Sequence, residues 1–553
     1  MKNKVLKNSL AIALAATMVV GCGSTAPAET GAEPKTETQT QTATSTESTD
    51  SATAAEASKY QTTYGSKQFD NVTITVELFD RSNAPDGSTI TDNKWTKYVN
   101  EQMNKVGINV EFVPVPRWDE VTKMQAMVAS QTAPDLTLTY TYAYAEDYYN
   151  QGGTWNLSEF IDGADQALNM KKYLGSDVID IGRNESGELY GIVAKRATTA
   201  KSNFFIRKDW LDKLGLEIPT NPDELYTALD KMVHENPDGM TGVSGAIIWN
   251  GWNLKQVFSK IAGDPLKVNV CGGGEDVIQD YYDPGMYDYY QFLNKLYNGG
   301  ILHQEYYNLA EDDFKSEIVT GNLGFCEYSV NGNVDVLRGS LLKTLKENVS
   351  DADFVSIPQF KNINDGQVYS AAYGAGGLIA FCPKTASEEV VEACMTYLDW
   401  MCTEDGGFVL YHGFEGEHYD MVDGVPVVKD AEYNAQDKDW IRTDLFIVGN
   451  QGYFETVDDF NKCTSKEAPG YEDYVIQNYE YALAGTLNHD ASYTSPSTAD
   501  LITDLNIAKD DYQVKMITCA PEEFDQMYNE YMDELKSVGI DTIISEREEH
   551  YNN

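Results

Sequence analysis

Val72-Thr73-Ile74-Thr75-Val76-Glu77-Leu78-Phe79 alternates apolar and polar side chains, which is the pattern of a half-buried β-strand. Apolar side chains then recur every four residues across 95–103, which predicts a helix. Residues 108–113 and 134–138 repeat the strand pattern, and a second helix is predicted near 121–128. The order strand, helix, strand, helix, strand predicts a doubly wound sheet of parallel strands with right-handed crossovers.

The residues at the ends of these elements predict helix caps and a binding edge. Thr91 can cap the first helix, and Gly107 ends it. In doubly wound sheets, ligands bind beyond the carboxyl ends of the strands. We therefore expect a binding edge at the side chains that follow the first and third strands, which are Asp80, Arg81, Tyr140, Tyr142 and Tyr144.

The N-terminal region has the features of an export signal. A positively charged start precedes an apolar run over residues 10–20, which is too short to span a bilayer as a helix and is typical of a signal peptide. The run closes on Val19-Val20-Gly21-Cys22, which resembles the bacterial lipobox, where the cysteine is lipidated and the chain is cut before it. We expect residues 1–21 to be a lipoprotein signal peptide, Cys22 to carry the lipid, and the Ser- and Thr-rich residues 22–66 to form a disordered tether.

The chain is strongly acidic. Its 553 residues carry a net charge of -46, which would repel a phosphate backbone and argues against nucleic-acid binding. The seven cysteines after Cys22 are scattered without a CxxC pair, so neither a disulfide framework nor a thiolate metal site is expected. Cys382, Cys394 and Cys402 lie in apolar stretches and are predicted to be small buried residues. The 36 tyrosines suit polar, ring-shaped ligands, although a general preference of the source organism explains them equally well.

The later chain alternates strands and helices again. Residues 203–207 are a predicted strand that leads into a helix over 208–214, with Gly215 as its C-cap. Asn221-Pro222-Asp223-Glu224 has the cap, the proline and the acidic residue of a helix start. The glycine-rich stretch 371–381 is predicted to be extended, and its glycines indicate a close approach of backbones and not a phosphate-binding loop.

Four stretches together resemble the extracellular solute-binding lipoproteins of carbohydrate ABC transporters, and more narrowly the large type that includes alginate-oligosaccharide binders. They are the lipobox with its tail, residues 205–220, the Tyr-His-Gly-Phe-Glu-Gly-Glu-His-Tyr run at 411–419, and a predicted C-terminal helix within 524–539. The resemblance implies an α/β, two-lobe periplasmic-binding-protein (Venus-flytrap) fold. Each lobe would be a doubly wound sheet and discontinuous in sequence.

The resemblance also implies where the lobes divide. Lobe 1 would comprise residues 67–200 and 373–410, and lobe 2 residues 201–372. The remaining residues 411–553 would be shared between the lobes, with a mostly helical C-terminus. The chain would cross between lobes near 195–205 and 370–378.

The implied function is capture of an oligosaccharide outside a bacterial cell and its delivery to the membrane subunits of an ABC permease. The protein would be a lipid-anchored monomer without enzymatic activity. Two alternatives stay open, which are a surface carbohydrate receptor or adhesin without transport, and a polysaccharide-degrading enzyme. An enzyme would need a carboxylate pair at a fixed separation, and among 87 acidic residues such pairs carry no information. The sequence has no HExxH, GxSxG or P-loop pattern.

A sugar site needs flat aromatic faces and polar groups that match hydroxyls. Trp249, Trp252 and Tyr373 are candidate platforms in addition to the tyrosines after the third strand. The further polar candidates are Arg207, Asn331, Asn333, Glu415 and His418. Burial in a core is the alternative for each aromatic residue. Arg207 can instead form a structural ion pair, and Glu415 and His418 can instead brace their loop.

Many relatives carry a calcium loop where this chain has residues 236–242. An oxygen cage for calcium needs Asp or Asn at alternate positions and a later Glu. Met240, Gly242 and Val243 interrupt that pattern, so we expect a plain turn and predict no metal or cofactor.

Overall fold

The computed structural model describes residues 58–249, 251–262, 276–330, 341–450, 452–489, 493 and 495–552. The predicted signal peptide, Cys22 and most of the predicted tether lie outside the described residues, as do Asn331 and Asn333. The packed chain begins at Ser58, before the predicted lobe boundary at 67, because Tyr60 is buried and stacks on Phe160 with ring centroids 4.0 Å apart.

The first strands and helices form as predicted. Strand β1 (Val72–Asp80) pairs in parallel with β2 (Ile108–Pro116), and they are joined through α1 (Lys94–Met103). Helix α2 (Glu120–Ala129) then leads to β3 (Thr137–Thr139). These residues keep the predicted order of elements.

The cap of α1 differs from the prediction. Asn93, and not Thr91, is the N-cap, because its Oδ1 atom accepts hydrogen bonds from the backbone N–H groups of Trp95 (2.9 Å) and Thr96 (3.0 Å). The observed cap lies two positions after the predicted one. The backbone of Asn93 is extended, as a cap requires.

The strands predicted to be parallel are so, because β1 pairs with β2 and Val76 pairs in parallel with Leu136 just before β3, but the first four-stranded sheet, which contains β3, is mixed. Its strand order is β13 (Gly449–Asn450), β4 (Ile192–Arg196), β10 (Gly376–Phe381) and β3, and β10 runs antiparallel to both β4 and β3. Backbone hydrogen bonds of Leu136 with Thr75 and Glu77 join this sheet to β1. The antiparallel strand arises because β10 returns to the sheet from a distant part of the sequence.

The second sheet has the order β6 (Ser244–Ile248), β7 (Leu323–Ser329), β5 (Ser202–Arg207) and β8 (Phe354–Ile357). Helices α7 (Lys208–Leu214) and α8 (Pro222–His234) follow β5, with Gly215 in the left-handed conformation at the end of α7, as predicted. Asn221 caps α8 by accepting the N–H of Glu224 (3.0 Å). Both predicted helix boundaries are therefore confirmed.

The remaining elements cover these sheets or connect them. The N-terminal part adds α3 (Tyr142–Asn150), α4 (Ser158–Ile161), α5 (Leu168–Leu174) and α6 (Ser176–Ile179). The middle part adds α9 (Trp252–Phe258), α10 (Asp276–Tyr282), α11 (Gly285–Asn298), α12 (Glu311–Val319), α13 (Leu341–Asn348), β9 (Tyr369–Ala372) and α14 (Glu388–Met401). The later part adds α15 (Val409–His412), β11 (Tyr419–Val422), β12 (Val425–Val428), α16 (Ala431–Asn434), α17 (Arg442–Leu445), α18 (Val457–Lys466), α19 (Glu472–Ala482), β14 (Thr486–His489), α20 (Thr498–Thr518), α21 (Phe524–Val538) and α22 (Ile540–Asn552).

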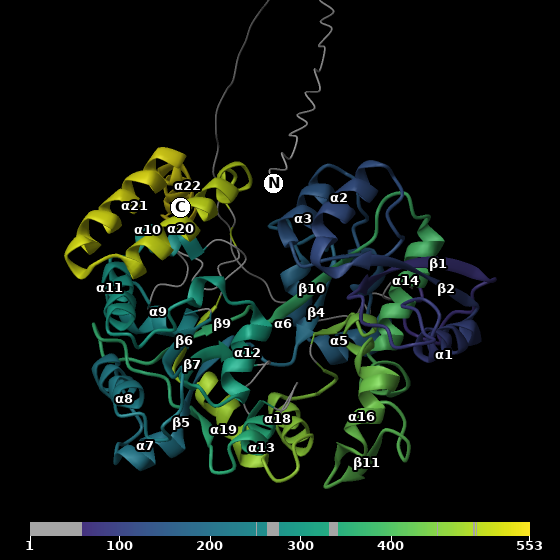
Figure 1. The fold of residues 1–553 in the computed structure, drawn as a ribbon. Helices are drawn as coiled ribbons and strands as arrows, with labels where there is room; N and C mark the ends of the chain where they lie inside the picture. The colour runs from purple at the N-terminus through teal and green to yellow at the C-terminus, as the bar shows by residue number, and fades with distance from the viewer. Residues whose placement is uncertain are drawn as a thin grey trace, which may run out of the picture. The chain divides into compact units, whose positions relative to one another are not determined.

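Two large hydrophobic cores form around the two sheets. The first core gathers buried residues from 60–194 and 378–448, and the second core gathers residues from 204–302, 325–360 and 505–543. Helices α20, α21 and α22, drawn in yellow, lie together beside α10 and α11 (Figure 1). Each core thus combines segments far apart in the sequence, while the exact division into lobes stays a proposal.

Two chain segments run side by side where the cores meet. The segment between β4 and β5 pairs with the one between β9 and β10, through bonds from the N–H of Tyr373 to the carbonyl of Thr199 (2.7 Å) and from the N–H of Arg196 to the carbonyl of Ala375 (3.1 Å). A Cβ atom on Gly377 would lie 2.6 Å from the Cβ of Asn450, so the glycine-rich stretch does permit a close backbone approach.

The side chain of Asn100 forms hydrogen bonds with the backbone at the outer edge of strand β2. The amide of Asn100 on α1 accepts the N–H of Val110 (2.8 Å) and donates to its carbonyl (2.9 Å). In the part of the chain that the structure describes, β2 pairs with no strand other than β1. Asn100 therefore satisfies backbone groups that a further strand would otherwise use.

Cys382, Cys394 and Cys402 are buried free thiols, as predicted. None of the helices in the described ranges combines the length and the hydrophobicity that crossing a bilayer requires.

Candidate functional site

The carboxyl ends of the parallel pair β1–β2 lie beside that of β3, because β1 bridges in parallel to Leu136 just before β3. Asp80 ends β1, and its Oδ1 atom accepts the N–H of Ser82 at 2.8 Å. Arg81 forms a two-pronged ion pair with Asp444 of α17, at 2.6 Å from Nε and 2.8 Å from Nη2. Tyr140 follows β3 and is partly buried. Three of the predicted site residues therefore lie together at the expected edge.

Trp118 follows β2 at this edge and was not predicted. Its side chain is 80% exposed, the largest exposed fraction of the exposed large hydrophobic residues. The guanidinium carbons of Arg117 and Arg81 lie 5.2 Å and 5.5 Å from the centre of its ring. An exposed indole with two arginines beside it offers a flat apolar face bordered by hydrogen-bond donors.

Arg117 has aromatic neighbours but no acceptor. Its guanidinium carbon lies 4.3 Å from the ring centre of Tyr140 and 5.2 Å from that of Phe79. The Nε atom is buried, and among the described residues the guanidinium has neither a hydrogen-bond acceptor nor an ion-pair partner. Because a guanidinium stays charged in proteins, this edge presents a positive charge that the protein leaves unpaired.

Two buried carboxyl groups lie beneath the edge. Glu77 of β1 is fully buried, its Oε2 atom accepts the N–H of Leu138 (3.0 Å), and burial raises its pKa to about 8. Glu120 of α2 accepts the N–H of Tyr140 (3.2 Å), and burial raises its pKa although the charge of Arg117 opposes this. The environment of both groups favours their neutral form.

The row of aromatic and cationic groups continues to the paired segments between the cores. Burial raises the pKa of Tyr140, and the charges of Arg117, Arg81 and Arg196 oppose that shift. The Arg196 guanidinium carbon lies 4.1 Å from the ring centre of Tyr373, and the Lys201 Nζ atom lies 4.4 Å from the same ring centre.

Trp252 joins the end of this row. Its ring centre lies 5.3 Å from the Nζ atom of Lys201, and the side chain packs against Ala371 of β9. Tyr142 donates its hydroxyl to the carbonyl of Gly377 (2.7 Å), and Tyr144 is partly buried against the first core. Tyr142 and Tyr144 therefore support the edge from within.

Other sequence candidates lie elsewhere. Trp249 is partly buried and stacks on Phe314 with ring centroids 5.2 Å apart, in a smaller cluster beside the second sheet. Asn331 falls outside the described residues. Glu415 is exposed in the loop before β11.

Arg207 and His418 are corrected, because both are buried and paired inside the protein. Arg207 is 0% exposed and holds Asp209 with two bonds of 2.8 Å while donating to the carbonyl of Gly321 (2.7 Å). His418 is also 0% exposed, and its ring nitrogens bond the N–H of Phe414 (3.0 Å) and the carboxylate of Asp437 (2.8 Å). Both residues brace their surroundings and do not face a ligand.

Two clusters of carboxylate side chains resemble metal sites, but each already contacts a cationic side chain. In the turn over 236–242, Asp238 is bound by Trp210 Nε1 (2.7 Å) and faces the positive groups of Lys213 and Arg207. The carboxylates of Glu417 and Asp437 beside His418 lie 2.7 Å and 3.1 Å from the Nζ atom of Lys94. In each place a cationic side chain already pairs with the carboxylates.

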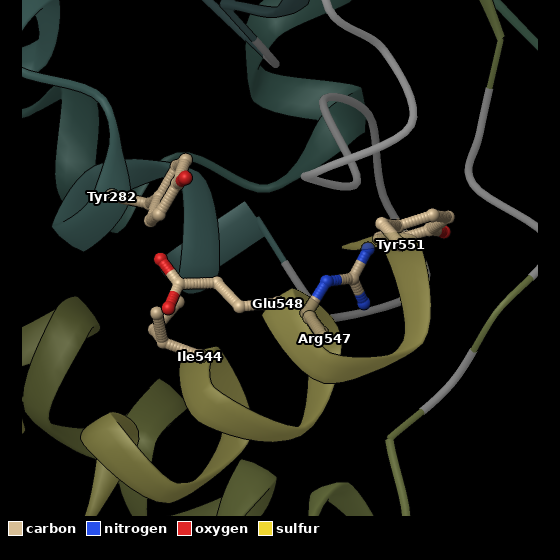
Figure 2. Close-up of a pocket in the computed structure, with 5 residues that line it drawn as sticks. All are labelled: Tyr282, Ile544, Arg547, Glu548 and Tyr551. Carbon is tan, nitrogen blue, oxygen red and sulfur yellow. The ribbon is translucent and has the colours of Figure 1, made fainter. Parts of the chain in front are cut away.

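Two hollows in the surface are lined by other residues. Figure 2 shows a cavity between α10 and α22, lined by Tyr282, Ile544, Arg547, Glu548 and Tyr551, with a volume of about 10 Å³. That volume is at the limit for one water molecule and cannot hold a sugar. An open groove of about 600 Å³ runs along α1 and β2 on polar side chains such as Thr96 and Asn100.

Comparison with known proteins identifies a family and two relatives of this chain. Residues 97–412 match the family model of bacterial extracellular solute-binding proteins. The chain is 24% identical over 290 residues to lipoprotein LipO of Bacillus subtilis, covering 50% of this chain and 54% of LipO. It is 22% identical over 356 residues to the polygalacturonan/rhamnogalacturonan-binding protein YtcQ of Bacillus subtilis, covering 62% of this chain and 66% of YtcQ. The matches thus span between about half and two thirds of these relatives.

A solved structure supports the fold over a longer span. The alginate-binding protein AlgQ2, solved without calcium ion, matches with a TM-score of 0.61 at 18% identity and covers 90% of this chain and 100% of its own. The two-lobe α/β fold predicted from the sequence is therefore confirmed. Because the family model matches more than half of the chain, this protein belongs to the bacterial extracellular solute-binding proteins.

Proposed function

We propose that the protein captures an oligosaccharide on the outer face of a bacterial cell membrane and delivers it to the membrane subunits of an ABC permease. The observation that carries this proposal is the exposed ring of Trp118 at the carboxyl ends of parallel strands, with Arg81 and Arg117 beside it. Ligands of doubly wound sheets bind at this kind of edge.

The chemistry of the edge suits a sugar. The exposed indole offers a flat face for the C–H surface of a pyranose, and the arginines offer donors for its oxygens. Arg196, whose charge acts on Tyr140, lies 4.1 Å from the ring centre of Tyr373. Aromatic and cationic groups beyond Trp118 favour a chain of several sugar units over a single one.

Relatives support the ligand class and the anchor. YtcQ is named for binding polygalacturonan and rhamnogalacturonan, AlgQ2 for binding alginate, and LipO as a lipoprotein. The Val19-Val20-Gly21-Cys22 stretch supports lipid attachment at Cys22. A lipid anchor would hold the protein near its permease and raise its local concentration there.

The two cores suggest how binding is communicated. The row of side chains reaches from the first sheet to the segments that join both cores, so a ligand lying along it can contact both. Such a ligand would shift the population towards a closed state, because it binds that state more tightly. The closed form would then dock on the permease as a monomer.

Calorimetric titration of the purified full chain with a panel of oligosaccharides tests the proposal. At least one oligosaccharide is expected to bind and to be recovered unchanged after long incubation. Trp118→Ala should weaken binding about tenfold, or about 1.4 kcal/mol, whereas Tyr307→Ala, an exposed aromatic residue elsewhere, should not. A panel without any binder would refute oligosaccharide capture, and released products would indicate an enzyme.

A further inference from the structure

We propose that the ligand of this site is an acidic carbohydrate, an oligosaccharide with carboxylate-bearing (uronate) units, and that Arg117 is the residue that binds its carboxylate. The inference rests on the proposed oligosaccharide binding and adds the charge of the ligand and the residue that reads it.

The first step compares the ion-pair partners of Arg117 with those of other arginines. Arg81 is paired with Asp444, Arg183 with Asp162 at 2.6 Å, and Arg207 with Asp209. Arg117 has no such partner within the described residues, and its Nε atom is shielded from water. The rest of the side chain is only partly buried, so the guanidinium stays open to a ligand while one of its donors has no partner among the described residues. A carboxylate brought by the ligand would supply that partner through charge-assisted hydrogen bonds.

The second step is that none of the described acidic groups near Arg117 forms an ion pair with it, although its charge acts on both Glu120 and Asp444. Glu77 and Glu120 lie beneath the site in environments that raise their pKa, and Asp444 is already held by Arg81. Asp80 accepts a backbone N–H and makes no ion pair with Arg117. In a chain with a net charge of -46, an arginine left unpaired at a strand end is unexpected for a surface that binds only neutral groups.

The third step is geometry. The guanidinium of Arg117 lies near the rings of both Trp118 and Tyr140, at 5.2 Å and 4.3 Å. A sugar ring stacked on the exposed indole would therefore place its substituents next to the guanidinium. The planar fork of an arginine matches a carboxylate with two parallel bonds, which a hydroxyl group cannot reproduce.

Matched ligand pairs test the inference on the full chain. Calorimetry would compare trimers of galacturonate, mannuronate and guluronate with the same trimers after reduction of each carboxylate to CH₂OH. At least one acid trimer is expected to bind at least tenfold more tightly than its reduced counterpart. Its affinity should fall as NaCl is raised from 20 to 500 mM, because screening weakens the charge pair.

Variants identify the residue. Arg117→Gln should lower the ratio of acid-trimer to reduced-trimer affinity towards one, whatever it does to the affinity for the reduced trimer, and Arg117→Lys should restore part of that ratio by returning the charge without the fork. Arg183→Gln, an arginine on the same core with its own ion pairs, is the matched control and should keep the preference.

The outcomes separate the two proposals. Equal binding of acid and reduced trimers would overturn the acidic ligand and leave oligosaccharide capture standing. Failure of every oligosaccharide would overturn the function itself. An acid preference that survives Arg117→Gln, or a variant that loses stability but keeps its affinity for the acid trimer, would show that Arg117 serves Glu120 or another internal group and would overturn the assignment.

Discussion

Replacing Arg207 by alanine should destabilise the protein and leave ligand binding unchanged. Arg207 is fully buried on β5, where it forms two bonds to Asp209 and one to the carbonyl of Gly321, and its guanidinium carbon lies 4.2 Å from the ring centre of Trp210. The alanine variant would leave the carboxylate of Asp209 at 9% exposure without its main partner.

The size of the effect follows from what remains around Asp209. Removing one member of a buried ion pair costs about 3–5 kcal/mol, because the other charge stays in a poorly solvated place. Asp209 still accepts the N–H of Asp353 (3.0 Å) and lies 3.5 Å from the Nζ atom of Lys213. These contacts place the expected loss at the lower end, about 3 kcal/mol of the free energy of unfolding.

Urea denaturation followed by circular dichroism measures this loss, with Arg183→Ala as the control. Arg183 also forms two ion pairs, but its partners Asp162 and Asp180 are 51% and 63% exposed. Exposed pairs contribute about 0–1 kcal/mol, so the control should lose less than about 1 kcal/mol. An equally small loss in Arg207→Ala, combined with weaker oligosaccharide binding, would refute the structural role and restore Arg207 to the binding site.

Three further changes test other features. Glu77→Gln should flatten the pH dependence of stability. Folding raises the pKa of Glu77 from its ordinary 4.5 to about 8, so the folded state keeps a proton that the unfolded chain releases. The free energy of unfolding of the parent should therefore fall between these pH values by up to about 1.4 kcal/mol per pH unit, and parallel parent and variant curves would contradict this. Gly377→Ala should cost about 1–3 kcal/mol in thermal unfolding, because the new Cβ would lie 2.6 Å from that of Asn450, and an unchanged transition would argue against close packing there. Asn93→Ala should cost about 1 kcal/mol through the lost helix cap, while Thr91→Ala should cost clearly less, and the reverse order in urea denaturation would favour the sequence-based cap.

The sequence predicted the elements whose periodicity is strong. The alternation in β1 and the repeated apolar residues in α1 were sufficient to place both, as was the proline-containing start of α8. The antiparallel course of β10 was not predictable from local pattern, because its partners β3 and β4 lie far away in the chain. Helix α20 was also missed, since it contacts α10, α11, α21 and α22 and therefore lacks a single apolar face.

The candidate site was missed at its centre for a physical reason. The second strand was expected over residues 108–113, and the next residues include Pro114 and Pro116, which lack the N–H that an inner strand needs. β2 nevertheless continues to Pro116, in register with Asp80 of β1. It lies at the edge of its sheet, where prolines are tolerated. The strand end therefore moves along the chain to Arg117 and Trp118.

The sequence left a ligand contact and a structural role open for Arg207 and His418, because residue type does not reveal burial. Arg207 lies in a stretch that resembles relatives, and a charged residue near a crossing suggests a ligand contact. Its partners Asp209 and Gly321 are recognisable only after β5 and β7 have paired.

The amide of Asn100 on the outer edge of β2 has a consequence for solubility. An open strand edge is a template on which a second copy of the chain can add a strand and start an aggregate. Because Asn100 occupies the N–H and the carbonyl of Val110, an incoming strand would have to displace it before the ladder could pass the middle of β2. A single short amide thereby hinders the edge-to-edge addition of further copies of the chain at high protein concentration.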